Sequence, residues 1–256
     1  MSTFKFFPEG WKSEETEETK DILQGIVKNC DKDYNLHVEL KNGMHGIIPR
    51  QEIEAINIDE KGFPKENLCI GKVHKYVQFK LKEKDGDKLI FSRKDVQQEV
   101  LNSVKTDLKV GDNIKGIVKN ITPYGAFIDI GGGVVGLAYI EDLSVARIKT
   151  PYERLKIGQN VNIVVKSINR ETGKLNLSYK DTLGTWEENA KKFSVGMNTK
   201  GIIRETEKNK NGIFIELTPN LVGMAEYKEG LKYGEKVDLY IKKIDYDKKK
   251  VKVVLL

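Results

Sequence analysis

Between positions 109 and 181, apolar and polar residues alternate through five short segments that are rich in β-branched side chains. Turn-forming residues bound the segments, among them Thr122-Pro123 and the triple glycine at 131–133. This pattern is typical of short strands joined by tight turns. A polar stretch at 141–157 predicts a short helix or turn between the third and fourth strands. The predicted strands are 113–121, 125–130, 135–139, 160–168 and 174–179.

The pattern occurs three times in the chain. The sequence Gly-Ile-Val-Lys-Asn at 25–29 recurs unchanged at 116–120, and a looser copy begins at Gly201. A repeat of this size indicates related structural units. The predicted organisation is an acidic N-terminal tail (1–20), a degenerate first copy (21–95), a linker (96–108), a second copy with the strongest pattern (109–181), a helical linker (182–194) and a third copy (195–256).

Five strands in about 70 residues, with an irregular segment after the third, are typical of a small closed barrel of the OB type. The stretches 95–107 and 182–193 lack strand alternation and are predicted to be helical connectors. The predicted fold class is therefore all-β, with three tandem five-stranded OB-fold barrels joined by short helical linkers.

Two phenylalanines are predicted to lie on the outer faces of their barrels. Alternate side chains of a strand point to opposite faces. If Ala126, Ile128 and Ile130 face the core, Phe127 shares the outer face with Asp129. The third copy repeats this arrangement with Phe214 beside Glu216, and the first has His37 beside Glu39. An exposed ring on this face of an OB barrel favours stacking of a nucleic-acid base, although a connector or a neighbouring copy covering the ring is the alternative.

Further candidates surround these rings. Tyr124 leads into the strand of Phe127, Tyr139 ends the next strand, and Arg170 and Lys174 flank the last loop, where they are expected to meet phosphate. Lys119 keeps a basic first-strand position, as a phosphate contact or as a solvated lysine. The third copy keeps Phe214 and Lys250 and the first keeps Tyr34, so we expect copy two to bind most strongly, then three, then one.

Charge supports a polyanionic partner. The net charge of +6 is uneven: residues 1–20 carry −2, copy one +1, and copies two and three +4 each. A basic surplus in two of the copies points to nucleic acid, while a lysine-rich solvated surface explains the composition equally well. The acidic run at 14–18 is expected to be a solvated tail, or a shield for the basic face.

Other classes find little support in the sequence. No Walker loop occurs, and the triple glycine is interpreted as a strand connection rather than a phosphate cradle. The histidines and both cysteines, Cys30 and Cys69, match no standard zinc spacing. We therefore expect no enzyme activity, catalytic residue, metal or cofactor. Two cysteines without a Cys-x-x-Cys pair, no apolar run of 18 residues and no secretory signal predict a cytoplasmic protein with no membrane partner.

The motifs of copy two resemble the S1 domain, an OB-type RNA-binding module named after a bacterial ribosomal protein. They are Lys109-Val110-Gly111-Asp112, Gly116-x-Val118, Tyr124-Gly125-Ala126-Phe127-Ile128-Asp129, Gly136-Leu137, Ile140-x-Asp142-Leu143 and Leu155-Lys156-x-Gly158-Gln159. The whole chain resembles a short, three-repeat member of the family of bacterial 30S ribosomal protein S1. Copy one is similar to the family's N-terminal repeats, which serve in ribosome docking more than in RNA binding.

The resemblance implies single-stranded RNA, messenger or ribosomal, as the partner and a role in translation, with the 30S subunit as a further partner through copy one. The RNA-binding residues that it implies are Tyr124, Phe127, Tyr139, Asn169 and Lys174 in copy two, and Phe214, Asp245 and Lys250 in copy three. The rival hypothesis is a scaffold whose barrels grip proteins of the ribosome or of the RNA-processing or decay machinery. Deleting residues 1–95 would separate docking from RNA affinity.

Overall fold

The computed structural model describes residues 6–9, 21–86, 88–206 and 212–256. The acidic run at 14–18 lies outside these residues, as does Lys208 in the third copy. Four residues of the predicted tail, Phe6–Glu9, are described, and they pack against the rest of the chain, with Glu9 buried. These four residues, which precede the run at 14–18, are therefore part of the packed structure.

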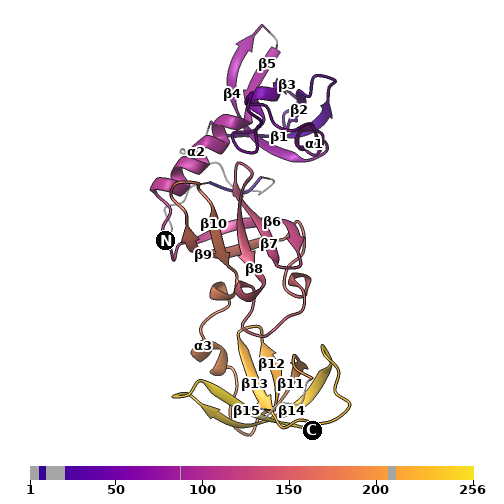
Figure 1. Cartoon of the computed structure of the whole chain (residues 1–256), viewed down its shortest axis with the longest axis vertical. Coiled ribbons are helices and arrows are strands. Elements are labelled where there is room, and N and C mark those ends of the chain that lie inside the picture. The colour runs from indigo at the N-terminus through magenta and orange to yellow at the C-terminus, as the bar shows by residue number, and fades with distance from the viewer. Residues whose placement is uncertain (1–5, 10–20, 87, 207–211) are drawn as a thin grey trace. The chain divides into compact units, whose positions relative to one another are not determined.

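The strands close into three five-stranded barrels (Figure 1). The strand order is β1-β2-β3-β5-β4 in the first, β10-β8-β7-β6-β9 in the second and β11-β12-β13-β15-β14 in the third, so each copy has the same topology. This confirms the predicted all-β fold with three OB-type barrels. The strands are β1 Leu23–Cys30, β2 Leu36–Leu40, β3 His45–Ile48, β4 Tyr76–Asp85, β5 Lys88–Ser92, β6 Asn113–Thr122, β7 Gly125–Gly131, β8 Val134–Tyr139, β9 Asn160–Ile168, β10 Leu175–Ser178, β11 Asn198–Ile203, β12 Ile213–Thr218, β13 Leu221–Ala225, β14 Lys236–Asp245 and β15 Lys250–Leu255.

The inward faces follow the predicted alternation of two. Ala126, Ile128 and Ile130 of β7 are fully buried, whereas Phe127 between them is half-buried. In the first barrel, alternate residues of β2 join Phe79 and Phe91, whose ring centroids lie 4.5 Å apart. Apolar side chains fill the interior of each barrel, so the outward side chains are the ones available to a ligand.

Two helices connect the copies. Helix α2, Arg93–Thr106, starts at Ser92, whose hydroxyl accepts the backbone N–H of Asp95. Helix α3, Trp186–Ala190, has a capping box between Thr185 and Glu188 and is shorter than the predicted connector. The remaining helical segments are α1 Glu66–Ile70 and the short 3-10 turns η2 Arg50–Glu52, η3 Ile140–Asp142, η4 Pro151–Glu153 and η5 Lys180–Thr182.

Arg93 at the start of α2 is held in a buried ion-pair network. Its guanidinium donates to the Glu9 carboxylate at 2.8 Å, pairs with Glu54 at 3.0 Å and donates to the carbonyl oxygen of Gly132 at 3.0 Å. The two carboxylates outweigh the effect of burial and raise the pKa of Arg93. The triple glycine is thus the predicted strand connection, and it is also where α2 docks, since a Cβ on Gly133 would overlap the Arg93 guanidinium.

The chain divides into two compact units. The first comprises residues 1–120, 127–137 and 157–176, and the second 121–126, 138–156 and 177–256. The first unit contains barrel one, α2 and most strands of barrel two; the second contains barrel three, α3 and the loop 138–156. In the part of the chain that the structure describes, no helix has the length and apolar character needed to cross a membrane.

Candidate nucleic-acid interface

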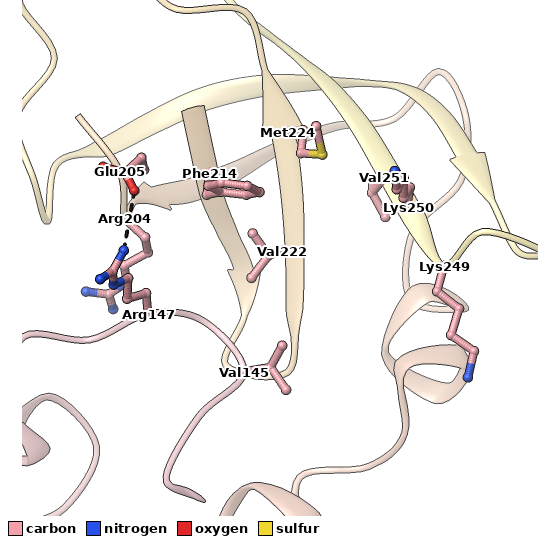
Figure 2. A pocket seen from close by; sticks show the side chains of 10 residues that line it. All are labelled: Val145, Arg147, Arg204, Glu205, Phe214, Val222, Met224, Lys249, Lys250 and Val251. Atoms are coloured by element: carbon pink, nitrogen blue, oxygen red, sulfur yellow. Dashed lines mark ion pairs between the residues drawn. The ribbon is translucent and has the colours of Figure 1, made fainter. Parts of the chain in front are cut away.

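A groove of about 430 Å³ lies on the outer face of barrel three, around the Phe214 ring (Figure 2). We call it the Phe214 groove. Apolar side chains of β12 and β13 line its middle, and basic side chains flank them on both sides. Its lining residues are Val145, Arg147, Arg204, Glu205, Phe214, Val222, Met224, Lys249, Lys250 and Val251.

The strand pattern explains why Phe214 faces this groove. Ile213 and Ile215 are fully buried in the barrel core, so Phe214 points outward and is only half-buried. On the neighbouring strand it pairs with Met224, which faces the same way. Two apolar side chains on a basic surface give a floor on which a flat ring system can stack.

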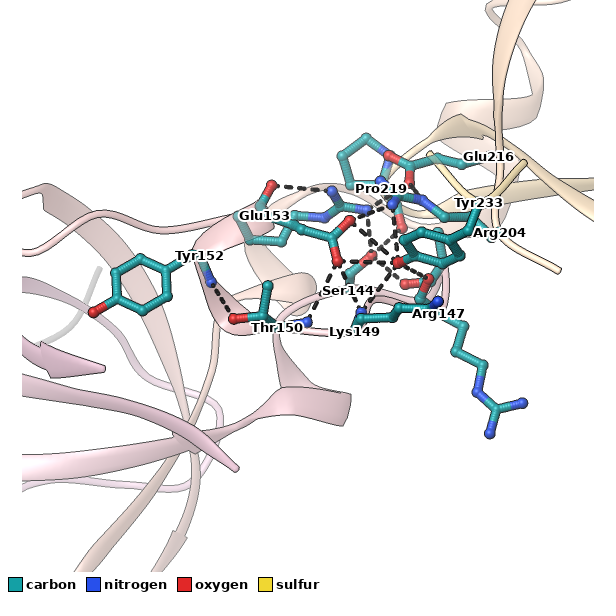
Figure 3. Close-up of polar contacts among 12 residues, drawn as sticks. Ser144, Arg147, Lys149, Thr150, Tyr152, Glu153, Arg204, Glu216, Pro219 and Tyr233 are labelled. Carbon is teal, nitrogen blue, oxygen red and sulfur yellow. Dashed lines mark hydrogen bonds and ion pairs between the residues drawn. The ribbon is translucent and has the colours of Figure 1, made fainter. Parts of the chain in front are cut away.

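The carboxylate beside Phe214 lies in a buried network (Figure 3). Glu216 accepts from Arg204 at 2.5 Å and from Arg154 at 2.6 Å, and Arg204 also pairs with Glu153. Although burial opposes it, hydrogen bonds from the Lys149 N–H, Tyr233 and Arg204 lower the pKa of Glu153, so its carboxylate stays ionised. Two arginines thus offset two carboxylates beside the groove.

The loop 138–156 completes the Phe214 groove. The backbone N–H groups of Val145 and Ala146 both donate to the carbonyl oxygen of Pro219, which follows β12. This anchoring brings Arg147 to the rim, where its side chain is 85% exposed and pairs with Glu205 at 3.8 Å. An arginine from the sequence of copy two therefore serves the groove of copy three.

One ion pair recurs in all three barrels. The basic residue of the first strand pairs with the acidic residue that follows the outward ring: Lys28 with Glu39 at 3.1 Å, Lys119 with Asp129 at 3.2 Å and Arg204 with Glu216 at 2.5 Å. Neighbouring antiparallel strands place these side chains together on the outer face. Lys119 also donates to the carbonyl oxygen of Glu9. Lys119 thus neutralises a carboxylate beside Phe127, and its contact with a phosphate stays a prediction.

Three of the predicted loop residues shape the chain itself. Asn169 Oδ1 accepts the N–H groups of Glu171 and Thr172, and Asp245 Oδ1 accepts that of Lys248, so both residues form the last turn of their barrel. The turn hydrogen bond and Lys243 lower the pKa of Asp245. Arg170 donates to the carbonyl oxygens of Val104, Lys105 and Leu108 and so caps the end of α2, while its contact with a phosphate stays a prediction.

A second groove, of about 380 Å³, lies on the outer face of barrel one. We call it the His37 groove. It is lined by Lys28, His37, Val38, His45, Gly46, Ile47, Lys88 and Leu89. Ile47 pairs with Ile90 in barrel one, and its counterpart Met224 pairs with Lys252 in barrel three. Ile90 therefore corresponds to Lys252, and Lys88, two residues earlier, corresponds to Lys250. Copy one therefore keeps the last-strand lysine of the groove.

The remaining predicted residues have distinct surroundings. His37 Nε2 lies 3.1 Å from Asp31. The Arg50 guanidinium lies 4.7 Å from the centroid of the Tyr34 ring, so this ring already has a cation–π partner within its own barrel. In copy two, Phe127 is half-buried and Lys174 is exposed at the start of β10. Tyr124 and Tyr139 are 52% and 38% exposed, as expected for rings that meet a ligand.

Among the residues that line these grooves, the sequence did not identify Lys88, His45, Met224 or Arg147 as binding candidates. Lys88 was hidden by the longer polar loop of copy one, and the pairing register identifies it. Met224 follows the glycine that all copies share, a signal already present in the alignment. Arg147 belongs to another copy, so no comparison of repeats could find it.

Comparisons with known proteins agree with this architecture. The model of the family described as "S1 RNA binding domain" matches residues 16–94 and 107–180. Small ribosomal subunit protein bS1 of Staphylococcus aureus (strain MRSA252) is 36% identical over 194 residues, covering 68% of this chain and 49% of the relative. The bS1 protein of Chlamydia muridarum is 28% identical over 232 residues, covering 85% of this chain and 40% of the relative. Neither description is that of an enzyme.

The solution structure of GSP13 from Bacillus subtilis is 29% identical, covering 30% of this chain and 60% of that chain with a TM-score of 0.29, which is too low to carry an argument. The chain spans about half the length of the curated bS1 relatives that it matches. Because the family model covers well over half of its residues, the chain belongs to the family of S1 RNA-binding domain proteins.

Proposed function

We propose that the chain binds single-stranded RNA on the outer faces of its barrels, without catalysing a reaction on it, and that it acts in translation. The observation that carries this proposal is the Phe214 groove: an outward aromatic ring with Met224 beside it, flanked by Arg147 and Lys250. Rings serve base stacking and cations serve phosphates, and neither depends on base identity.

The groove suits a single strand better than a duplex. Stacking on Phe214 requires an unpaired base whose face is accessible, and duplex RNA hides its bases within the helix. The family adds to this, since its domain is described as RNA-binding. Each barrel is expected to bind weakly, and tethering of the three raises the overall affinity.

The test is truncation of the two stacking rings. Phe127→Ala is expected to weaken binding of a single-stranded oligomer of about 20 nucleotides by about 1–3 kcal/mol, because each base–ring stack contributes that much. Phe214→Ala is expected to cost less binding free energy. Copy two, which also presents Tyr124 and Tyr139, is expected to bind most strongly and so to contribute more of the affinity. Fluorescence anisotropy measures both affinities, with Tyr152→Ala, another exposed tyrosine, as the control. Parent-like affinity in both phenylalanine variants would remove stacking from the account.

We further propose that copy one contacts the small ribosomal subunit, the assembly in which the named bS1 relatives belong. Deleting residues 1–95 would not isolate this contact, because the deletion also removes Glu9 and Arg93, which contact barrel two. A His37→Ala/Lys88→Ala variant alters the His37 groove and leaves the contacts of Glu9 and Arg93 with barrel two in place. Reduced co-sedimentation with small subunits at nearly unchanged oligomer affinity supports docking; unchanged co-sedimentation contradicts a role for this groove.

A further inference from the structure

A third groove, of about 620 Å³, adjoins the Phe214 groove on barrel three. The two share Met224, which lines both. The third groove runs over the ends of β13, β14 and β15, and Tyr227 and Lys228 lie at its rim just beyond β13. We call it the Tyr227 groove.

The strand register gathers lysines in the Tyr227 groove. Met224 pairs with Lys252 on β15, and Lys252 pairs with Lys243 on β14. The register shifts between Ile241 and Lys243, so Lys242 is an extra residue in a bulge. A bulge redirects a side chain and interrupts strand pairing, and here Lys242 lines the groove with Lys252.

Lys242 and Lys252, which line the Tyr227 groove, are unpaired in the part of the chain that the structure describes. No ion pair or side-chain hydrogen bond among the described residues holds the ammonium groups of Lys242, Lys250 or Lys252, whereas Lys243 pairs with Asp245 at 3.1 Å. Barrel one differs at the same positions: its bulge residue, Lys82, pairs with Glu52, and Ile90 stands in the place of Lys252. Barrel one therefore lacks the unpaired lysines of copy three at these two positions.

The groove combines this charge with an exposed ring. Tyr227 is 38% exposed, and among the lining residues one carboxylate, Glu226, stands against three lysines, at 228, 242 and 252. An anion with repeated charges and flat apolar groups matches such a surface. An acidic peptide would satisfy the lysines but would leave the ring and the continuity with the Phe214 groove unused.

We propose that the two grooves form one path, along which a single strand of RNA crosses Met224 from Phe214 to Tyr227. The proposal rests on the proposed function and adds a second subsite to it, with Lys242 and Lys252 at phosphates. A strand of about 4 nucleotides fills the Phe214 groove alone, and a strand of about 10 reaches the Tyr227 groove, within the span that one OB barrel can cover.

The experiment compares two oligomer lengths with a probe confined to barrel three. The chain has four methionines, and Met224 lies on the wall that the two grooves share. The methyl signal of Met224 in ¹³C-methyl-methionine NMR of the full chain therefore reports binding there, with Met44 of copy one as the internal reference. Oligouridines of about 4 and 10 nucleotides are titrated into the parent and into a Lys242→Gln/Lys252→Gln variant.

We expect the Lys242→Gln/Lys252→Gln variant to bind the longer strand about 10-fold more weakly than the parent does, with a shallower salt dependence. It is expected to bind the shorter strand within about 2-fold of the parent, because only the longer strand reaches Lys242 and Lys252. A Lys232→Gln/Lys236→Gln variant, with the same charge change before and at the start of β14, is expected to match the parent.

Equal losses for both lengths, or no loss for the longer strand, would overturn the path while leaving RNA binding at Phe214 intact. A parent that binds neither oligomer would overturn the proposed function as well. Displacement of the longer strand by polyglutamate of equal charge, at equal concentration, would show an acidic peptide site and overturn the assignment to RNA.

Discussion

At the scale of single residues, the carboxylates beside the two outward phenylalanines are buried, which the sequence does not predict. Asp129 and Glu216 are 0% and 5% exposed, and each is matched by a basic residue from the first strand of its barrel. An ionised carboxylate next to a bound phosphate repels it, so neutralisation by Lys119 or Arg204 makes the outer face suitable for a polyanion. If the chain binds RNA as proposed, these cations act on it indirectly.

Asp129 is expected to titrate far above its ordinary range. Complete burial and the neighbouring Glu9 raise its pKa from 3.8 to about 6, against the opposing effect of Lys119. The folded chain therefore binds a proton between about pH 6 and pH 4 that the unfolded chain does not, so this group adds stability as the pH falls through that window. The lowered pKa of Glu9 acts oppositely, and only below its ordinary value of 4.5.

The titration can be read from the side-chain carboxyl carbons by ¹³C NMR. Asp129 is expected to show a midpoint near pH 6, while Asp245, whose pKa is lowered, titrates below 3.8 in the same samples. A midpoint for Asp129 below 4 would contradict this and show that Lys119 and the hydrogen bond from Gly131 outweigh the effect of burial.

The direction of each side chain could be predicted from the sequence, but its surroundings could not. Alternation correctly placed Phe127 and Asp129 on the face opposite Ile128, yet it implied that Asp129 is exposed. Its burial comes from Glu9, 120 positions away, whose backbone N–H lies 3.3 Å from the carboxylate. The alternation of inward and outward side chains along a strand carries no information about a partner so distant in the chain.

At the scale of elements, the strands and the connectors were predictable and their contacts were not. The first predicted strand of copy two ends one residue from the observed end of β6, because turn residues mark the boundary. The polar face of α2, by contrast, gave no sign that Arg93 enters the first turn as a buried cation. Its partners come from the N-terminal segment and two barrels, a convergence that only the tertiary fold creates.

Arg93→Met tests the importance of this convergence. The substitution keeps most of the side-chain volume and leaves Glu9 and Glu54 buried without their shared cation, so the free energy of unfolding is expected to fall by about 3–5 kcal/mol. Urea denaturation at neutral pH measures the change. Arg147→Met, at an 85% exposed arginine, is the matched control and is expected to change stability by less than about 0.5 kcal/mol. A loss below about 1 kcal/mol in Arg93→Met would show that the network contributes little net stability.

At the scale of the whole molecule, three barrels of one topology present three different outer faces. Copy one offers His37 and Lys88, copy two offers Phe127 with two exposed tyrosines, and copy three offers Phe214 with unpaired lysines. The Gly-Ile-Val-Lys-Asn segment that copies one and two share marks common ancestry, while the residues that we propose to meet a ligand lie on the second, third and last strands. From this divergence we expect a division of labour among tethered weak sites.

The most direct test of RNA binding compares a single strand of about 20 nucleotides with a duplex of the same sequence, both bound to the intact chain over a range of salt concentrations. The account predicts clearly tighter binding of the single strand, with an affinity that falls steeply as salt rises, by a log–log slope of about 0.7 for each phosphate neutralised. Equal affinity for the two forms, or binding of the single strand that is insensitive to salt, would contradict it.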